Sequence, residues 1–224
     1  ISQLLKRPPV LSYASYAMQN WKRIDPVGPI ALGNLALLLK FLGGFDESGF
    51  ILVHVDIEAK AGGAGWELWN GYHAVLQNEP ATAGKHLLAA AVSLQQMNHT
   101  LQGMPKWCNH YIYYNRVRPY IHGWKDNPTF PDGVVYQGCF NSKPQKFWGE
   151  TGAQSSVIPL VDAFLGIKHP KDKLRHYLKE MREYMPPRHR MFLTTVEDHS
   201  MLIRDYVRER SELHELYNQC VTQL

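Results

Sequence analysis

Cysteine is scarce in this chain, and long apolar runs are absent. Only three of the 224 residues are cysteines, and they stand in unrelated contexts: Cys108, Cys139 and Cys220. This usage fits a reducing compartment better than a disulfide framework. No apolar run approaches the roughly 18 residues that cross a bilayer, and the first residues lack the apolar core of a signal peptide. We therefore expect a cytoplasmic protein with no membrane partner.

A concentrated charge of one sign is also lacking. The net charge is +4, and the lysines and arginines are scattered along the chain. Nucleic acids and membrane surfaces require a clustered basic face, so neither is an expected partner. The sequence has no Walker loop, no dinucleotide fingerprint, no H-E-x-x-H helix and no G-x-S-x-G elbow. Cys108 and His110 have no further ligands at zinc spacing, which argues against a structural zinc site.

What the chain does contain is helical patterning. Apolar spacing, caps and Gly or Pro breaks indicate about ten helices and few strands, so the sequence predicts an all-α fold in a single domain over residues 1–224. The predicted helices cover residues 10–23, 35–42, 46–62, 66–77, 80–103, a segment starting at 105, 152–165, 172–184, 188–196, 201–208 and 212–224. Turn signals predict an irregular region at about 125–151, with one short strand at 134–136.

One stretch, residues 113–124, concentrates aromatic rings, two guanidinium groups and an imidazole. In a regular helix Tyr114 and Arg118 would lie at i and i+4 and share one face. An Arg offers paired N–H donors that bind a carboxylate bidentately, and an adjacent ring would hold the flat body of the same ligand. The alternative interpretation is that Arg118 pairs with an acidic side chain and that the tyrosines belong to the core.

A second candidate segment is residues 149–156, Gly-Glu-Thr-Gly-Ala-Gln-Ser-Ser. Small residues and hydroxyls before a helix leave backbone N–H groups open to a flat ligand. In order with three further segments, this loop resembles the indoleamine 2,3-dioxygenase family. Those segments are Arg-Val-Arg-Pro-Tyr-Ile-His-Gly-Trp-Lys at 116–125, Pro-Asp-Gly-Val-Val-Tyr at 131–136 and Glu-Met-Arg-Glu-Tyr-Met-Pro-Pro-Arg-His-Arg at 180–190. Residues 11–14 and 49–53 fit the earlier portion of the family, so the resemblance covers essentially the whole chain.

The resemblance implies an all-α domain that binds haem b. Its iron would bind O2 and deliver both oxygen atoms to the indole C2–C3 bond of L-tryptophan, giving N-formylkynurenine for the kynurenine pathway. The implied partners are L-tryptophan or a related indole and O2, and we expect a monomer. In cofactor enzymes of this kind the protein orients the substrate, and the cofactor carries out the oxygen chemistry.

Carried over by position, the family's substrate site falls on five residues. Arg118 matches the Arg that holds the substrate carboxylate. Tyr113 and Tyr114 stand where family members often have paired Phe, flanking the indole, and their hydroxyls need partners that a Phe pair does not. Phe50 matches an aromatic wall of the indole pocket, and Tyr13 lines the same side.

Four further residues are implied around the haem. Thr151 and Gly152 match the loop over the haem edge, where Ser-Ala is common. Asp162 matches an acid near the haem propionates that orients an Arg, a supporting role. His54 falls at the distal position, where vertebrate members carry a Ser and the related tryptophan 2,3-dioxygenases a His. We expect a catalytic role in which its imidazole accepts the indole N–H or donates to bound O2, depending on the tautomer.

The resemblance places the proximal haem ligand outside this chain. In relatives the ligand is a His about three turns after the position that matches Cys220, and the sequence stops at Leu224 before reaching it. His214 lies too early on the same predicted helix. No residue of the chain is therefore assigned as a metal ligand. We expect the 224 residues to be the central part of a haem domain, without the small N-terminal domain of the relatives.

Three alternatives to the dioxygenase stay open. One is a non-enzymatic O2-binding haem protein, since molluscan myoglobins share this family's fold. Another is a haem enzyme that acts on a different indole, for which the hydroxyls of Tyr113 and Tyr114 leave room. A third is a haem-free helical interaction protein. Arg118 favours an enzyme, because an O2 carrier needs no clamp for a substrate carboxylate.

Overall fold

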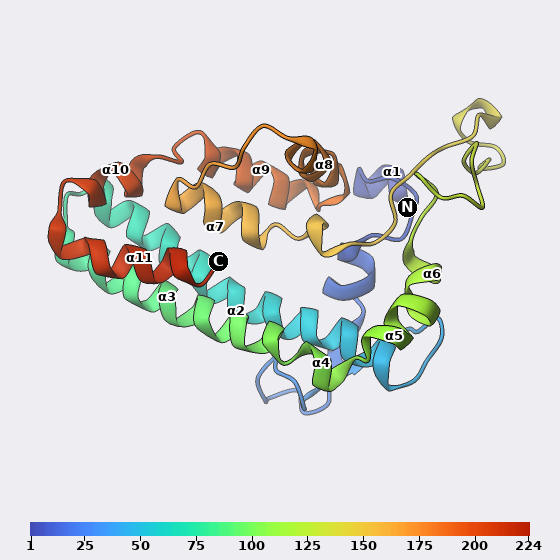
Figure 1. Ribbon diagram of the computed structural model, residues 1–224, viewed down its shortest axis with the longest axis horizontal. Coiled ribbons are helices and arrows are strands. Elements are labelled where there is room, and N and C mark those ends of the chain that lie inside the picture. Colours follow the sequence, from blue (N-terminus) through green and yellow to red (C-terminus); the bar gives the residue numbers. More distant parts are fainter.

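A long antiparallel helical hairpin forms the framework in the computed structural model, which describes all 224 residues (Figure 1). Its two arms are α2 (Phe45–Leu76) and α3 (Pro80–Gln102). α11 (His214–Thr222) packs along α3, whereas α7 (Val157–Leu165) packs on α2 and α9 (Pro187–Glu197) packs on α7. The predicted all-α fold is confirmed, because helices dominate and the one sheet has only two short strands.

The remaining helices are shorter and connect this framework. The α-helices among them are α1 (Ser2–Leu5), α4 (Met104–Trp107), α5 (His110–Ile112), α6 (Arg118–Ile121), α8 (Lys173–Met181) and α10 (Leu202–Arg208). Two π-helical turns are η1 (Ala14–Met18) and η2 (Tyr113–Val117). Four 3-10 turns are η3 (Phe140–Ser142), η4 (Gly152–Gln154), η5 (Arg182–Tyr184) and η6 (Ser211–Leu213). The predicted helices at 80–103, 172–184, 188–196, 201–208 and 212–224 are confirmed within their ends.

The predicted helix boundary at residues 62–66 is wrong. α2 runs through Gly62 and Gly63 without a break for 32 residues. A helical Gly costs about 1 kcal/mol relative to Ala, and packing of the two hairpin arms offsets this cost. The absence of a side chain also allows close approach, because a Cβ on Gly63 would lie 3.0 Å from the Ser93 hydroxyl of α3.

Two helices predicted near the N-terminus are also wrong. Residues 10–23 form only the η1 turn and then β1 (Trp21–Arg23), which pairs antiparallel with β2 (Leu35–Leu37) in the second predicted segment. The fully buried Glu47 carboxylate accepts the backbone N–H groups of Phe41, Leu42 and Gly43 at 2.7–2.9 Å. These donors are committed to a side chain, so this stretch does not continue as a helix.

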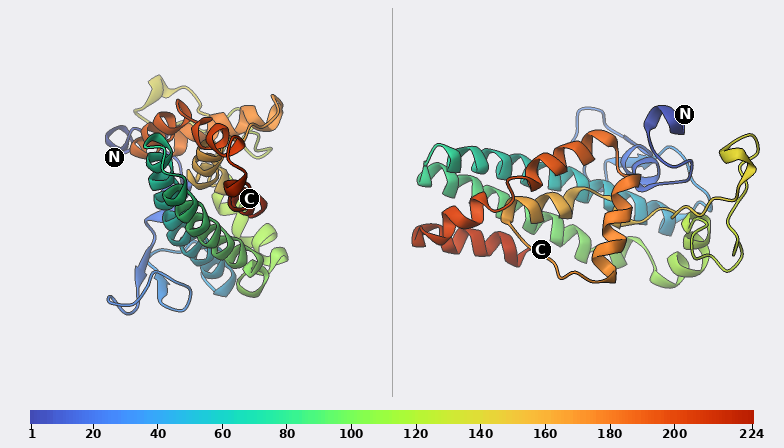
Figure 2. Two further views of the ribbon diagram at one scale, coloured as in Figure 1. Left: turned by 90° about the vertical axis from the view of Figure 1, so that its left-hand side faces the viewer. Right: turned by 90° about the horizontal axis from the view of Figure 1, so that it is seen from above.

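The segment predicted to be helical from residue 105 is divided into four short turns, α4, α5, η2 and α6. Beyond it the chain is irregular through about residue 151, with η3 its one helical turn. The predicted strand at 134–136 is reduced to a single bridge between Val134 and Gln145. Figure 2 shows this loop projecting at the end of the molecule opposite α10.

Buried apolar side chains form two clusters. The larger unites 22 residues of α2, α3, α7, α9, α10 and α11 around Leu68, Leu87 and Leu94. The smaller unites seven residues from η1, β2, the first turns of α2 and the end of α6: Tyr13, Tyr16, Ala17, Leu35, Ile51, Val55 and Ile121. Of the candidate site residues, Tyr13 belongs to the smaller cluster, and Phe50 and Tyr113 pack against it.

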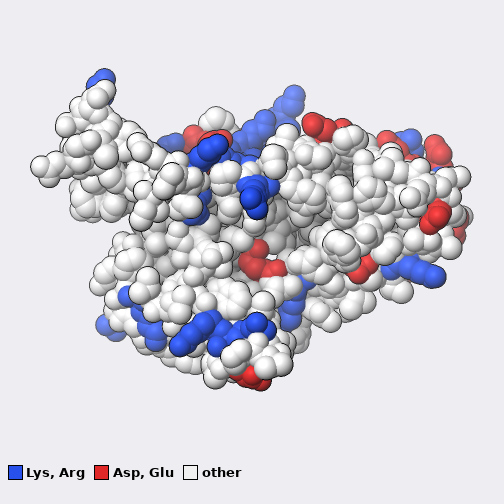
Figure 3. Space-filling view, turned by 180° about the vertical axis from the view of Figure 1, so that it is seen from behind, with Lys and Arg blue, Asp and Glu red and all other residues white.

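Charge and hydropathy add two observations about the surface. No helix of the structure is both long and apolar enough to span a bilayer. On the face shown in Figure 3, acidic and basic side chains are interspersed among uncharged ones rather than gathered into one basic area.

Candidate active site

Four aromatic side chains predicted from the sequence meet at the start of α2. The Phe50 ring stacks on Tyr113 with centroids 4.3 Å apart, and it lies 4.5 Å from the His54 ring. Tyr13, which is 1% exposed, meets His54 edge-on at 5.8 Å. Residues 13, 50, 54 and 113 come from three separate segments, so the fold assembles this aromatic wall.

Tyr114, in contrast, does not share a face with Arg118. The backbone N–H of Arg118 bonds to the carbonyl of Tyr113, five residues back, because residues 113–117 form a π-helical turn. A π-turn brings residues i and i+5 onto one face, whereas the predicted pairing assumed the α-helical spacing of i and i+4. Tyr114 is accordingly 67% exposed and points to solvent, and Tyr113 takes the place beside Arg118.

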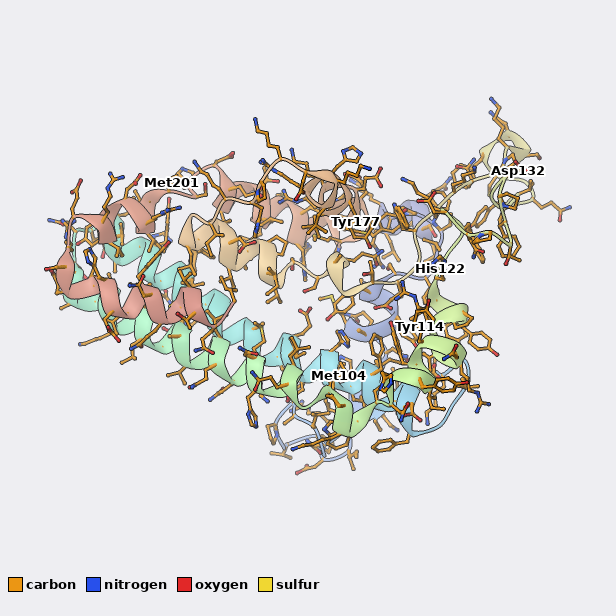
Figure 4. All side chains as sticks on the ribbon, viewed as in Figure 1. Met104, Tyr114, His122, Asp132, Tyr177 and Met201 are labelled. Atoms are coloured by element: carbon orange, nitrogen blue, oxygen red, sulfur yellow. The ribbon has the colours of Figure 1, made fainter.

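Arg118 lies at the rim of a small cavity of about 110 Å³. Its guanidinium forms no ion pair with an acidic side chain, so the alternative in which it pairs with an acidic residue is not observed, and its polar side-chain neighbour is the Tyr113 hydroxyl. The cavity is lined by eleven residues: Phe50, Tyr113, Arg118, Ile121, His122, Trp148, Gly149, Glu150, Thr151, Gly152 and Tyr177. His122 at the end of α6 and Tyr177 on α8 lie at its edges (Figure 4).

The His54 imidazole has a defined tautomer. Its Nδ1 lies 2.7 Å from the Phe50 carbonyl oxygen, which only accepts, so Nδ1–H is the donor and Nε2 keeps its lone pair. Burial lowers the pKa of His54, which keeps the ring neutral near pH 7. Nε2 faces the loop after Glu150, because a Cβ on Gly152 would lie 3.8 Å from it. His54 therefore presents a hydrogen-bond acceptor beside Gly152.

The loop that carries Thr151 and Gly152 is held from inside by Gln154. This buried side chain donates to the Gly149 carbonyl at 2.7 Å and accepts the Tyr13 backbone N–H at 2.8 Å. The Thr151 hydroxyl accepts the Ala153 N–H at 3.4 Å and so caps the turn η4. The loop is thereby tied to the segment that supplies Tyr13.

Asp162 is not part of this group. It lies on α7, and its Oδ2 is 2.7 Å from Nε2 of His169. The two side chains form an ion pair when the His169 ring is protonated. Both residues line a different, wider cavity of about 790 Å³ with several lysines and arginines. The structure thus brings together Tyr13, Phe50, His54, Tyr113, Arg118, Thr151 and Gly152, and it leaves out Tyr114 and Asp162.

Sequence analysis missed Glu150, which lines the cavity between Gly149 and Thr151. Desolvation by burial raises the pKa of its carboxyl to about 8, and the nearby charge of Arg118 opposes that rise. The signal in the sequence was an acidic residue inside a loop of otherwise small residues. Trp148, Tyr177 and His122 were missed for a different reason, since only the fold brings their elements to the cavity.

Comparison with known proteins decides the family. The sequence profile described as Indoleamine 2,3-dioxygenase matches residues 1–224, the entire chain. The chain belongs to the indoleamine 2,3-dioxygenase family. It is 37% identical over 228 residues to indoleamine 2,3-dioxygenase 1 of Rattus norvegicus and 36% identical over 226 residues to indoleamine 2,3-dioxygenase 2 of Homo sapiens. Both matches cover 100% of this chain.

The chain is also similar to a protein that is not named a dioxygenase. Myoglobin of Haliotis madaka is 28% identical over 225 residues, covering 99% of this chain and 57% of the myoglobin. The two indoleamine 2,3-dioxygenases are covered over 56% and 55% of their lengths. The chain therefore spans about half the length of the curated relatives it matches, and the resemblance found in the sequence motifs is confirmed as family membership.

Proposed function

We propose that the protein containing this chain is a haem-dependent dioxygenase that inserts O2 into the indole C2–C3 bond of L-tryptophan to give N-formylkynurenine. The observation that carries the proposal is the guanidinium of Arg118, which has no acidic partner, beside the stacked rings of Phe50 and Tyr113. A fixed cation next to an aromatic wall suits a ligand that has a carboxylate at one end and a flat ring at the other. Family membership supports the reaction class.

The residues around His54 fit a haem b group on the side where substrate and O2 would bind. Gly152 carries no side chain, and Nε2 of His54 lies 3.8 Å from where its Cβ would be, so these two residues would hold the edge of the macrocycle rather than enclose it. When bound, haem supplies the iron that activates O2. We propose Thr151 and Gly152 as its edge contacts and Asp162 as a more distant support near the propionates.

The chain's own residues divide the work of binding. Arg118 holds the substrate carboxylate, Phe50 and Tyr113 contact the indole ring, and the buried Tyr13 supports His54 from behind. His54 Nε2 accepts the indole N–H, because its Nδ1 proton is already committed to the Phe50 carbonyl. A neutral acceptor at this position orients the indole so that its C2–C3 bond is presented to O2. Tyr114 has no role in this arrangement, since it points to solvent.

Several wider features belong to the same proposal. The 224 residues would form one helical domain, a monomer in the cytoplasm, with no nucleic acid or membrane partner. None of these statements depends on the cavity beside Arg118.

The proposal is tested by incubating the haem-loaded protein with L-tryptophan, O2 and a reductant. We expect tryptophan-dependent O2 uptake and formation of N-formylkynurenine, measured by its absorbance and mass. Omission of either haem or L-tryptophan is the matched control. Reversible O2 binding without any product from L-tryptophan would contradict the proposal. That result would favour the second candidate function, an O2 carrier. The 28% identity to the myoglobin of Haliotis madaka is the observation that supports this candidate.

A further inference from the structure

Glu150 is a buried acid without a partner. It is 8% exposed, and neither carboxylate oxygen has a hydrogen-bond donor within reach. The one other buried oxygen without a partner is Oδ1 of Asp56, whose Oδ2 accepts from both Lys60 and Thr100. A buried polar group left unsatisfied costs about 1–3 kcal/mol, and more when it is charged. Glu150 therefore requires an explanation that Asp56 does not.

The backbone around Glu150 is fixed against α6. The Glu150 N–H donates to the Ile121 carbonyl at 2.8 Å, and the Gly149 N–H donates to the His122 carbonyl at 3.2 Å. Contact here is so close that a Cβ on Gly149 would lie 1.9 Å from the Ile121 oxygen. Gly123, with φ +79°, allows the same approach from the other side. The position of the Glu150 side chain beside Arg118 is thus set by paired backbones.

Arg118 and Glu150 line the same cavity, yet they form no ion pair with each other. A guanidinium without an ion-pair partner and a carboxyl without a hydrogen-bond partner therefore line a common space of about 110 Å³. That volume is well below the roughly 300–1,000 Å³ of pockets that enclose a drug-sized ligand. A cavity of this size suits the head of an amino acid. The carboxylate of the amino acid complements Arg118 and its ammonium complements Glu150, while the indole ring of the substrate lies outside the cavity against Phe50.

We propose that Glu150 binds the α-ammonium of the amino-acid substrate, opposite the carboxylate clamp of Arg118. This inference rests on the proposed function and names what distinguishes the substrate from other indoles. Glu150 would be a specificity-determining residue, since an indole without an ammonium group would leave it buried and unpartnered. Such unpaired polar groups are an effective means of rejecting near-isosteric ligands.

The charges around Glu150 are consistent with this role. Arg118 from α6, Tyr113 from η2, and Tyr13 and Tyr16 at η1 interact electrostatically with Glu150, and His122 and Tyr177 line the same cavity. Burial raises the pKa of the Tyr13, Tyr16 and Tyr113 phenols, so they stay neutral, and none of them donates its O–H to the Glu150 carboxyl. Arg118 is the one cation near it, and it is engaged by the substrate carboxylate when substrate binds. An arriving ammonium would therefore ionise Glu150 and release its proton.

The test compares three ligands by calorimetry on the haem-loaded protein and its Glu150→Gln variant. L-tryptophan carries both charges, tryptamine lacks the carboxylate, and indole-3-propionate lacks the ammonium. We expect Glu150→Gln to weaken L-tryptophan and tryptamine by about tenfold or more, the scale of a charge-assisted hydrogen bond, and to leave indole-3-propionate within about twofold. Glu212→Gln, at an exposed acid on η6, is the matched control and should change none of them.

Each other outcome overturns the inference in a distinct way. Equal weakening of all three ligands would assign Glu150 a structural role, and an unchanged L-tryptophan affinity would remove it from recognition altogether. In both cases the dioxygenase proposal stands, whereas failure of the unaltered protein to bind L-tryptophan overturns both the dioxygenase proposal and the role of Glu150.

A second experiment uses the unaltered protein alone. L-tryptophan binding at pH 7, measured in buffers of different ionisation enthalpy, should release more protons than indole-3-propionate binding, and equal release would contradict the inference.

Discussion

In the proposed function Arg118 binds the substrate carboxylate, because it is a cation beside the aromatic wall without an acidic partner. A hydrogen bond to a charged group contributes about 1.5–3 kcal/mol. Arg118→Ala should therefore raise the Kd of L-tryptophan roughly 10- to 150-fold. Arg118→Lys should lose part of the same free energy, since one ammonium cannot make the bidentate contact. Titration with tryptamine is the control, because it lacks the carboxylate, and an unchanged L-tryptophan Kd in Arg118→Ala would refute the clamp.

His54 gives a prediction about the indole N–H. Nε2 is held neutral and ready to accept, so His54→Ser should weaken L-tryptophan by roughly 2- to 10-fold, the worth of a neutral hydrogen bond. An analogue methylated on the indole nitrogen has no proton to donate and should bind both proteins alike. The lifetime of the O2 complex should also change. If His54→Ser changed neither ligand affinity nor that lifetime, the pocket role of His54 would be wrong.

Glu150 links the site to pH-dependent stability. Burial raises the pKa of its carboxyl to about 8 in the folded chain from an ordinary value of 4.5, so the folded state binds more protons between these values. The free energy of unfolding must then fall as pH rises from about 4.5 to 8. Glu150→Gln removes this dependence and should stabilise the fold at pH 7 by about 1–3 kcal/mol, since one pKa unit corresponds to about 1.4 kcal/mol.

Urea unfolding of both proteins from pH 4.5 to 8.5 measures that effect. The difference in unfolding free energy between Glu150→Gln and the unaltered protein should grow with pH. It should vanish near pH 4.5, where the Glu150 carboxyl of the folded chain is protonated and therefore neutral, as Gln is. A difference that is independent of pH would show that Glu150 is ionised in the fold. A gain in stability with a loss of ammonium binding is what a strained binding residue should show.

At the scale of elements, local chemistry predicted the helices whose ends are defined by their own residues. Asp172 caps α8 by accepting the Arg175 N–H at 2.9 Å, and Pro80 stands in the first turn of α3. The errors arose where distant residues decide. Glu47 takes the backbone donors of residues 41–43, and α3 supports α2 across its glycines. Neither contact is visible in a local window.

The same distinction holds for the site. Residue types and motif order led to Arg118, Phe50, His54 and the Thr151 loop, because their chemistry stands in the sequence itself. Because residues 113–117 form a π-turn, Tyr113 rather than Tyr114 lies beside Arg118. The sequence analysis assumed the four-residue spacing of an α-helix and so could not predict this. Glu150 was missed because an acid in a loop is ordinarily solvated, and only the backbone pairing with α6 buries it.

Two glycines of α2 test this view of the hairpin. A Cβ on Gly62 would meet nothing within 4 Å, so Gly62→Ala should stabilise the protein by about 0.5–1 kcal/mol through helix propensity. Gly49→Ala is the matched opposite, because its Cβ would lie 1.8 Å from the Trp107 carbonyl oxygen at the crossing with α4. It should destabilise by about 1–3 kcal/mol or more. Thermal unfolding of both variants measures the two effects, and the same sign for both would contradict the packing described.

For the whole molecule, the shared feature of the two hydrophobic clusters is α2. Leu68 belongs to the 22-residue cluster and Ile51 to the seven-residue cluster, and neither side chain has any exposed surface. The same helix therefore anchors the bundle at one end and the aromatic wall at the other. Phe50 and Tyr113 pack on the smaller cluster alone, so the geometry of the site depends on that end of α2.

This arrangement separates global stability from site geometry. Leu68→Ala and Ile51→Ala should each lower the free energy of unfolding by about 2–5 kcal/mol, measured by urea denaturation, because each leaves a cavity in a packed core. Only Ile51→Ala should also weaken L-tryptophan binding under conditions where both variants remain folded, since Phe50 packs against the cluster to which Ile51 belongs. Equal loss of affinity in both would mean that the site responds to the stability of the whole bundle, and that the smaller cluster has no separate part in holding the aromatic wall.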